Sequence, residues 1–437
     1  MELNKDQTVM SEDNNKPQDP NPRLAWEGCS VLLDVNDGDR LVFARLSGGA
    51  ILKIGNKNYS LKPLIGAPFG SLFQVESGED GSFLSRILPI KKENDHNNVM
   101  DDSRDNRELV DNNEAQNLTG EEIEAMRREG AKGDEIIEAL IANSKTFDKK
   151  FQLSQEKYKL KKQKKYAPKL LLRRPFSRSI CEAYFKKYPA RIGFLRVDAL
   201  SLLLTMANIT AYSDVLVVDM VGGLVTGAVA ERLGGTGYVC STYKGSSPYP
   251  VEMVRMFNFS DKVIERIVQA SVTELSSAKT ESPEENNQQG EIATSDSMVE
   301  DVSVTAEVRV VDNVVPERKI IKAPKAGAKA SKEIIDMWRE NGFSSLIIAA
   351  QDQDPWSFVK DALPLLSYSA PFAIYHQYLQ PLATCMHKLQ QEKMAINLQI
   401  TEPWLREYQV LPSRSHPHMQ MSSFGGYVLS GIRISTT

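Results

Sequence analysis

Residues 219–227, DMVGGLVTG, resemble a turn that binds a nucleotide-like cofactor. Such a turn needs one glycine for the tight bend and another where the backbone approaches the ligand. An acid at the end of the next strand holds the ribose hydroxyls. Counting from Asp219, valine occupies the first and last glycine positions, as Val221 and Val225, and only Gly223 is in register. The next apolar run ends in residues 240–243 without a carboxylate, so we predict that this chain binds no cofactor.

A second place for chemistry is the loop after the apolar run SSLIIAA, which reads AAQDQDPWSF. Asp352 and Asp354 have the side chains for acid or base chemistry. Exposed carboxylates in a loop more often form turns or cap helices, and we favour that interpretation. His416 and His418 offer two metal ligands without a third, so no metal site is predicted.

The elements around these residues favour an α/β fold. Residues 215–240 read as buried strand, glycine turn, helix, glycine stop and strand. An apolar helix, ALSLLLTMANI, precedes them, and PFAIYHQY, MAINLQIT and GGYVLSGIRI follow as further strands. We therefore predict a doubly wound, Rossmann-like domain over residues 191–437. Within it, residues 276–332 are acidic and then basic, and are expected to be a disordered insertion.

The first part of the chain is expected to be different. Residues 1–22 are polar and predicted disordered, whereas residues 23–90 alternate short apolar runs with turn signals and indicate a β-barrel-like domain. Residues 91–118 have few apolar groups and read as a mobile linker. Residues 119–190 are expected to form a helical connector, which begins at a capping box formed by Thr119 and Glu122.

A strongly basic run lies inside this connector. Residues 149–178 hold twelve lysines or arginines against the single acid Glu156, with Tyr158, Tyr166 and Phe176 interleaved. The simplest alternative is a solvated helix face. Because the acids that would pair with these cations are missing, we favour RNA or DNA binding. The segment KKQKK could also act as a nuclear import signal.

Composition places few limits on function. The net charge of -4 predicts no particular partner, so nucleic-acid binding must depend on the local run. No signal sequence or membrane-spanning stretch is evident, and we expect a soluble intracellular protein. Cys29, Cys181, Cys240 and Cys385 are scattered singly and are expected to be reduced core residues.

These residues resemble the family of non-catalytic subunits of the eukaryotic tRNA (adenine-N1)-methyltransferase, which methylates the T-loop adenine at position 58. The resemblance includes RELVDNN, LTGEEIEAMRREGAKGDEIIEALIANSKTF, EKYKLKKQKKY, RVDALSLLLTMANI, ERLGGTG and TEPWLREYQVLPSRSHPHMQMSSFGGYVLSGI. It implies a β domain followed by a degenerate class I methyltransferase domain. In QDQDPW, Pro355 and Trp356 match the D-x-P-x-P-W type motif of the catalytic partner, but Gln351 replaces its aspartate.

The resemblance also implies partners and a nuclear location. Two such chains assemble with two catalytic chains, and the catalytic chains bind S-adenosylmethionine. The residues expected to contact tRNA lie on the basic helix and next to it: Arg107, Lys157, Lys159, Lys161, Lys162, Lys164, Lys165, Tyr166, Lys169, Arg173, Arg174, Ser177 and Arg178. Two rival functions remain, which are an active methyltransferase that uses Asp219 or Asp352, and a general RNA-binding scaffold without a methyltransferase partner.

Overall fold

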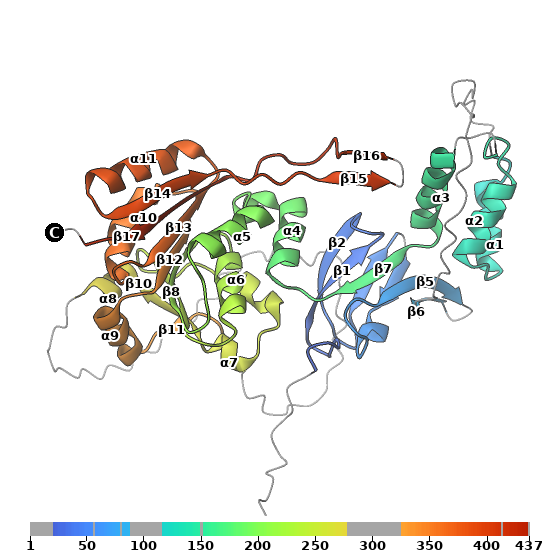
Figure 1. The fold of residues 1–437 in the computed structure, drawn as a ribbon. Helices are drawn as coiled ribbons and strands as arrows, with labels where there is room; N and C mark the ends of the chain where they lie inside the picture. The colour runs from blue at the N-terminus through green and yellow to red at the C-terminus, as the bar shows by residue number, and fades with distance from the viewer. Residues whose placement is uncertain are drawn as a thin grey trace, which may run out of the picture.

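The computed structural model describes residues 21–55, 57–78, 81–87, 116–148, 152–277, 325–411 and 414–435. The molecule is elongated, with an α/β domain at one end, a small β domain in the middle and three helices at the other end (Figure 1). Arg107, most of the start over residues 1–22, most of the linker over residues 91–118 and most of the insertion over residues 276–332 lie outside the described residues.

The β domain is built from antiparallel hairpins, as the alternation of apolar runs and turns predicts. β1 (Ser30–Val35) pairs with β2 (Arg40–Arg45), β3 (Ile51–Ile54) with β4 (Lys57–Ser60), and β5 (Leu72–Gly78) with β6 (Gly81–Ile87). In the β1–β2 turn, Asn36 and Asp37 adopt positive φ, which matches the right-handed twist of the two strands.

The central strand of this domain comes from a distant part of the chain. β7 (Lys169–Arg173) lies between β1 and β5 and gives the order β2-β1-β7-β5-β6. Leu170 and Leu172 are completely buried in the β core, whereas Lys169 is exposed. The prediction that residues 119–190 form only a helical connector was therefore wrong at this point. Three leucines inside a basic run are too short a signal to show a strand.

Three helices lie beyond the β domain. α1 (Gly120–Arg128) begins at the predicted capping box, in which the Thr119 amide donates to Glu122 Oε2 at 2.8 Å and the Glu122 amide donates to Thr119 Oγ1 at 3.3 Å. α2 (Gly133–Ala142) packs against α1 through Ile123 and Ile136, and α3 (Gln152–Tyr166) is the basic helix. The capping box confirms the predicted start of this region.

The C-terminal domain contains an eight-stranded sheet in the order β11-β10-β9-β8-β12-β13-β17-β14. Strands from β11 to β13 run parallel, and β17 is antiparallel to both of its neighbours. This is the strand order of the Rossmann-like class I methyltransferase fold. The strands are β8 (Asp214–Asp219), β9 (Tyr238–Tyr243), β10 (Ile267–Ser271), β11 (Ala328–Lys329), β12 (Ser345–Ala349), β13 (Pro371–His376), β14 (Ala395–Thr401) and β17 (Tyr427–Arg433).

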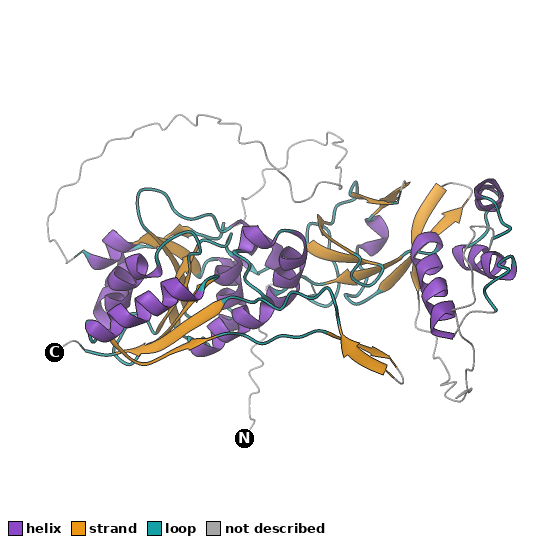
Figure 2. Ribbon diagram, turned by 90° about the horizontal axis from the view of Figure 1, so that it is seen from above, coloured by secondary structure: helices purple, strands orange, loops and turns teal. Residues whose placement is uncertain are grey.

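Helices cover both faces of this sheet (Figure 2). One face packs against α4 (Ser177–Lys187), α5 (Val197–Met206) and α6 (Leu224–Leu233), with the short α7 (Asp261–Ile264) beside them. The other face packs against α8 (Val272–Ser276), α9 (Lys332–Asn341), α10 (Pro355–Ala362) and α11 (Leu379–Gln391). The two apolar cores explain why the strands read as continuous apolar runs. All four cysteines are buried and free, as expected.

The disordered insertion predicted over residues 276–332 ends earlier than predicted. Ala328 and Lys329 pair with β10, and Lys329 Nζ lies 2.5 Å from Glu274 Oε1. Ser331 caps α9, since its hydroxyl accepts from the Ile334 amide. The fold therefore resumes before residue 332, because a short edge strand uses backbone hydrogen bonds that the polar sequence does not reveal.

A long arm leaves the C-terminal domain between β14 and β17. It carries β15 (Tyr408–Leu411) and β16 (Arg414–Pro417), which pair with each other, and it reaches past α5 and α4 (Figure 1). At its base, Arg196 donates to the Pro403 carbonyl at 3.3 Å and to the Ser422 carbonyl at 2.7 Å. Arg196 is 4% exposed and forms a bidentate pair with Asp198. One buried side chain thus connects the outgoing and the returning segment at the base of the arm to the start of α5.

Candidate functional site: a closed glycine turn and a basic helix

The glycine turn joins β8 to α6 at the carboxyl edge of the sheet, where such folds bind their ligands. Asp219 ends β8, is 0% exposed and accepts hydrogen bonds within the turn. Its Oδ1 accepts from the amides of Val221 at 2.9 Å and Gly223 at 3.1 Å, and its Oδ2 accepts from the Thr226 amide and hydroxyl at 2.8 and 2.9 Å. Burial raises the pKa of Asp219, and these donors oppose the rise. The carboxylate therefore takes the N–H groups that would otherwise face a ligand.

The outside of the turn is covered by the chain itself. Val221 and Val225 are 0% exposed and belong to the core between the sheet and the helices α4, α5 and α6. The Met253 amide donates to the Gly222 carbonyl at 3.0 Å. A Cβ added at Gly223, whose φ is +88°, would lie 2.6 Å from the Cα of Val251. The segment that follows β9 therefore packs directly on the glycines, in a contact that the sequence did not indicate.

The end of β9 offers no ribose acid. Ser241 and Thr242 are buried, and their hydroxyls have no hydrogen-bond partner among the described residues. Lys244, just beyond the strand, has its Nζ 2.6 Å from Asp361 Oδ2 and lies over the ring of Phe358. The Lys244 ammonium therefore lies near the end of β9, where a cofactor-binding fold would have a carboxylate.

The loop after β12 contains a helix cap. Asp354 is the N-cap of α10 and accepts from the Trp356 amide at 3.3 Å, which confirms the favoured interpretation. Asp352 is exposed. Gln351 lies where the resemblance expects the catalytic aspartate, and its Nε2 donates to the Ala190 carbonyl at 3.3 Å. A Cβ on Gly193 would collide with Gln351 Oε1, so the side chain is packed against the turn before α5 rather than toward solvent.

The basic helix α3 presents its cations at the surface. Lys162 and Tyr166 are half-buried, and the exposed lysines are Lys157, Lys159, Lys161, Lys164 and Lys165. Several of these lysines form ion pairs or ring contacts with other residues of the chain. Lys164 Nζ lies 2.7 Å from Asp39 Oδ1, and Lys162 Nζ lies 5.2 Å from the centre of the Tyr158 ring. Among the described residues, Lys157 and Lys161 have no ion-pair or ring partner, so they are the cations most available to a polyanion.

The remaining predicted contacts lie along β7, which follows α3 directly, and at the start of α4 (Figure 1). Lys169 is exposed, but Arg173 pairs with the buried Asp34 at 3.3 Å. The side chain of Arg174 donates to the Pro22 carbonyl, the Ser177 amide donates to Glu231, and Arg178 pairs with Glu182 at 2.7 Å. The structure therefore separates the predicted residues into a cationic helix and a second group that is engaged in internal contacts.

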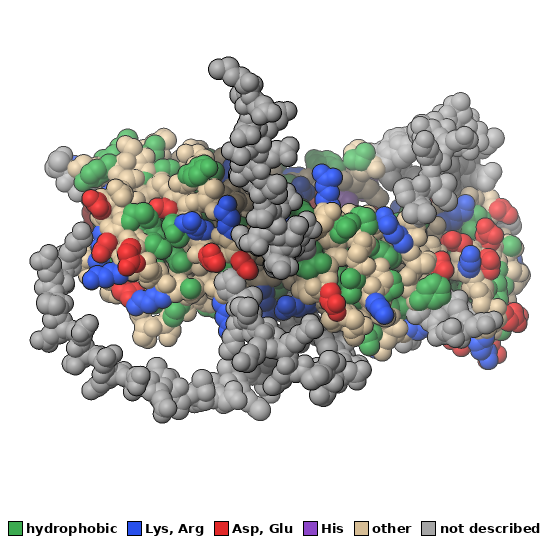
Figure 3. All heavy atoms as spheres, turned by 90° about the horizontal axis from the view of Figure 1, so that it is seen from below, with side chains coloured by type: hydrophobic (Ala, Val, Ile, Leu, Met, Phe, Trp, Pro, Cys, Tyr) green, Lys and Arg blue, Asp and Glu red, His purple; other side chains and the backbone are tan. Residues whose placement is uncertain are grey.

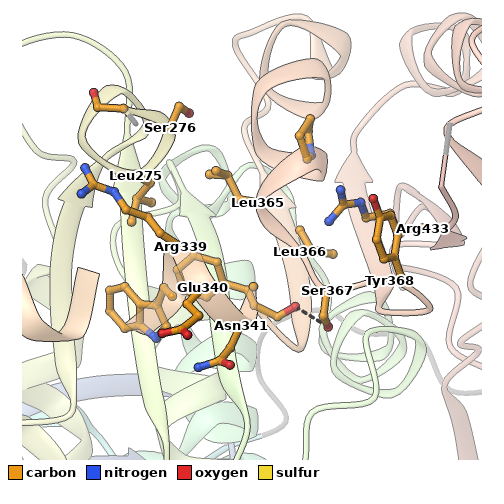
Figure 4. Close-up of a pocket in the computed structure, with 15 residues that line it drawn as sticks. Leu275, Ser276, Arg339, Glu340, Asn341, Leu365, Leu366, Ser367, Tyr368 and Arg433 are labelled. Carbon is orange, nitrogen blue, oxygen red and sulfur yellow. Dashed lines mark hydrogen bonds between the residues drawn. The ribbon is translucent and has the colours of Figure 1, made fainter. Parts of the chain in front are cut away.

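The described residues line several hollows that the sequence did not indicate, and two of them bear on the site. One, of about 610 Å³, lies between the β domain and the helices and is lined by Lys164, Lys165 and Tyr166. The other, of about 830 Å³, opens at the amino edge of the sheet, opposite the glycine turn (Figure 4). There Arg433 stacks on Tyr368, with 4.7 Å between the guanidinium carbon and the ring centre. The larger hollow is therefore remote from the position of a methyltransferase active site.

Other kinds of site receive no support from the described parts of the chain. No group of three metal-binding side chains is found there, and none of the helices there is long and apolar enough to cross a membrane. Acidic and basic side chains are interspersed on the face drawn in Figure 3. This agrees with the small net charge of the chain.

Comparison with known proteins identifies the family. A family model described as the Gcd10p family matches residues 26–301. The tRNA (adenine(58)-N(1))-methyltransferase non-catalytic subunit trm6 of Dictyostelium discoideum is 33% identical over 94% of this chain and 79% of its own length. The corresponding TRM6 of Mus musculus is 30% identical over 96% of this chain and 91% of its own length.

Solved structures are more distant. A SAM-dependent O-methyltransferase from Thermotoga maritima has 10% identity and a TM-score of 0.48, with 94% of this chain and 96% of that chain covered. The tRNA (m1A58) methyltransferase TrmI from Aquifex aeolicus has 11% identity and a TM-score of 0.43, with 94% and 99% covered. The fold assignment rests on the strand order of the sheet, and the family rests on the sequence matches. This chain belongs to the Gcd10p family of non-catalytic subunits of tRNA (adenine(58)-N(1))-methyltransferase.

Proposed function

We propose that this chain binds tRNA and holds the S-adenosylmethionine-binding catalytic subunit in place, without binding that cofactor itself. The observation that carries the proposal is the closure of the glycine turn by Val251 and Met253, while the cations of α3 remain at the surface. A chain with this fold, a glycine turn packed against Val251 and Met253, and a cationic helix at its surface is suited to scaffolding and RNA contact.

Calorimetry tests the cofactor part of this proposal. S-adenosylmethionine titrated into the purified chain should give no binding heat, because a ligand would have to displace packed backbone at Val251. The complex with the catalytic subunit is the positive control and should bind. Micromolar binding by this chain alone would overturn the proposal and favour the rival in which the chain is an active methyltransferase.

The arm is the surface that we assign to the catalytic partner. A two-stranded hairpin alone is only marginally stable in water, and the contacts of β15 and β16 are mainly with each other. Its apolar side chains nevertheless face solvent, with Trp404 77%, Val410 75% and Met419 93% exposed. Apolar groups on a protruding hairpin indicate a binding surface.

Size-exclusion chromatography with light scattering tests this assignment. Val410→Glu should reduce assembly with the catalytic subunit, because a charge would be buried without a partner. Tyr212→Glu is the matched control, since Tyr212 is 84% exposed but lies before β8, away from the arm. Equal assembly of both variants would refute the role of the arm. The same measurement on the wild type tests the two-plus-two stoichiometry that the family resemblance implies.

Two further parts of the proposal can be tested in cells. The lysine-rich segment of α3 is proposed to direct the chain to the nucleus, so a fluorescent fusion with Lys161, Lys162, Lys164 and Lys165 changed to Ala should accumulate in the cytoplasm. Affinity purification should recover a second chain with an intact D/E-x-G-x-G turn and a D-x-P loop. Recovery of RNA without such a chain would favour the rival of a general RNA-binding scaffold.

A further inference from the structure

The hollow of about 610 Å³ beside α3 has the features of a binding site. It lies where the β1–β2 and β3–β4 turns and β5 face the start of α2 and the end of α3. We call it the connector groove and define it by Tyr59, Lys132, Gly133, Lys164, Lys165 and Tyr166, which line it. Its volume falls within the range of about 300–1,000 Å³ that is usual for sites that bind small molecules or single residues of a polymer.

The polar lining of the groove has an excess of positive charge. Arg40, Lys57, Lys132, Lys164 and Lys165 line it, against Asp39, Glu76 and Glu124. Asp39 is paired with Lys164, and Glu76 accepts a hydrogen bond from Ser85 at 2.6 Å. Lys132 and Lys165 are exposed, and their ammonium groups form no ion pair among the described residues, although the Lys132 amide donates to Glu135 Oε2 at 3.0 Å. The rim of the groove therefore attracts an anion.

Tyr166 is the aromatic wall of the groove. Glu124, Lys165 and Tyr166 also line a second, open hollow of about 730 Å³ beside the start of α1, so these three residues lie between two concave surfaces. Lys165 Nζ lies 5.1 Å from the centre of the Tyr166 ring. A half-buried tyrosine flanked by a lysine offers both a face for base stacking and a charge for the adjoining phosphate.

The groove is preformed by a close approach of two helices. A Cβ on Gly133, at the start of α2, would lie 2.5 Å from the Tyr166 carbonyl oxygen and 2.8 Å from the Ala167 Cβ. Only glycine permits this contact, which fixes Tyr166 next to the start of α2. The wall of the groove is thus set before a ligand arrives, which lowers the entropic cost of binding.

The lining favours a nucleotide over an apolar peptide. The exposed lysines at its rim match the charge of a phosphate, and Tyr166 offers a ring face to a base, whereas Tyr59 at 4% and Ile136 at 1% exposed are buried in the floor. We propose that the connector groove takes an unpaired nucleotide of the tRNA, with the base against Tyr166 and the phosphate near Lys132 and Lys165. This inference rests on the proposed tRNA binding and adds a defined single-stranded contact to it.

Photo-crosslinking tests the inference in the assembled complex of this chain with its catalytic subunit. A tRNA transcribed with 4-thiouridine is irradiated on the complex, and crosslinked peptides are mapped by mass spectrometry. We expect a crosslink to the peptide that contains Tyr166, with Tyr166→Ala weakening tRNA binding about tenfold and Tyr166→Phe leaving it unchanged. The melting temperature of each variant shows whether the fold is retained.

Matched charge reversals separate the groove from the proposed function. Lys132→Glu with Lys165→Glu changes the groove rim, and Lys157→Glu with Lys161→Glu, the α3 pair, makes the same charge change on the part of α3 outside the groove. The groove pair should remove the crosslink, whereas the α3 pair should weaken tRNA binding but retain the crosslink.

Weaker tRNA binding by the α3 pair, with no crosslink in any complex, would overturn the groove proposal but not the proposed tRNA binding. Unchanged binding by both pairs would overturn the proposed tRNA binding as well. A protein segment that competes with wild-type crosslinking and is itself held by the groove would assign it to protein.

Discussion

Replacement of Asp219 by Asn tests whether the closed turn is structural. Each carboxylate oxygen of Asp219 accepts two hydrogen bonds, from Val221 and Gly223 on one side and from Thr226 on the other. Three of these four donors are backbone N–H groups, which cannot accept a hydrogen bond in return, so they favour the carboxylate over the neutral acid. In Asp219→Asn, the new amide would face the Thr226 amide, and both are donors. The Thr226 hydroxyl can turn to accept, but the buried Thr226 N–H would be left unpaired.

The size of this effect follows from those hydrogen bonds. An unpaired buried donor costs about 1–3 kcal/mol, and a hydrogen bond to a charged group contributes about 1.5–3 kcal/mol. Because the two contributions overlap, we expect the free energy of unfolding to fall by about 3 kcal/mol, a large share of the roughly 5–15 kcal/mol of a typical domain. For a domain of this size, the melting temperature should fall by about 6–12 °C.

Differential scanning fluorimetry of the full chain measures the shift, and methylation by the assembled complex supplies the second readout. Asp352→Asn is the control, because Asp352 is exposed and its replacement should change stability by less than about 0.5 kcal/mol. Below the melting transition, complexes with either variant should methylate tRNA at the wild-type rate. An unchanged melting temperature for Asp219→Asn would refute the hydrogen-bond argument. Lost methylation by a folded complex would show that Asp219 takes part in chemistry.

Three other changes have defined outcomes. Lys157→Glu with Lys161→Glu should weaken tRNA binding and lower the slope of log affinity against log salt by about 2, as measured by fluorescence anisotropy at several salt concentrations; an unchanged slope would make α3 a solvated face. Arg196→Lys should release the arm, because lysine cannot reproduce the bidentate pair and both carbonyl contacts; faster hydrogen exchange over residues 403–422 would show this, and unchanged exchange would contradict it. Hydrogen bonds from the Thr119 amide and hydroxyl lower the pKa of Glu122, so this cap is formed above the ordinary glutamate pKa of about 4.3 and is lost as pH falls through the lowered value. Protection of the Thr119 amide should therefore decrease at low pH, and Glu122→Gln should remove that dependence.

The order and type of most elements followed from the sequence, because local patterns report which faces are apolar. Continuous apolar runs predicted β8 and β12, which are buried between two helix layers. The capping box predicted the start of α1. The valines at 221 and 225 departed from the glycine pattern, and the structure places both of them in the core between the sheet and the helices α4, α5 and α6.

Contacts between distant segments were decided only by the tertiary structure. Leu170 and Leu172 insert β7 between β1 and β5, although their neighbours in sequence are basic. Val251 covers Gly223 because the chain after β9 returns to the carboxyl edge of the sheet, a path that no local pattern specifies. The groove beside Tyr166 arises in the same way, from helices and turns that meet across more than a hundred residues.

The physical reason is that a local sequence pattern describes only its own strand or helix. The periodicity of apolar residues fixes which side of a strand or helix is buried, and the absence of a glycine or a carboxylate can exclude a binding chemistry. It does not say which other segment buries that side, since many apolar partners are equivalent until the chain has packed. The sequence therefore determined what the glycine turn after Asp219 lacks, and the fold decided what closes it.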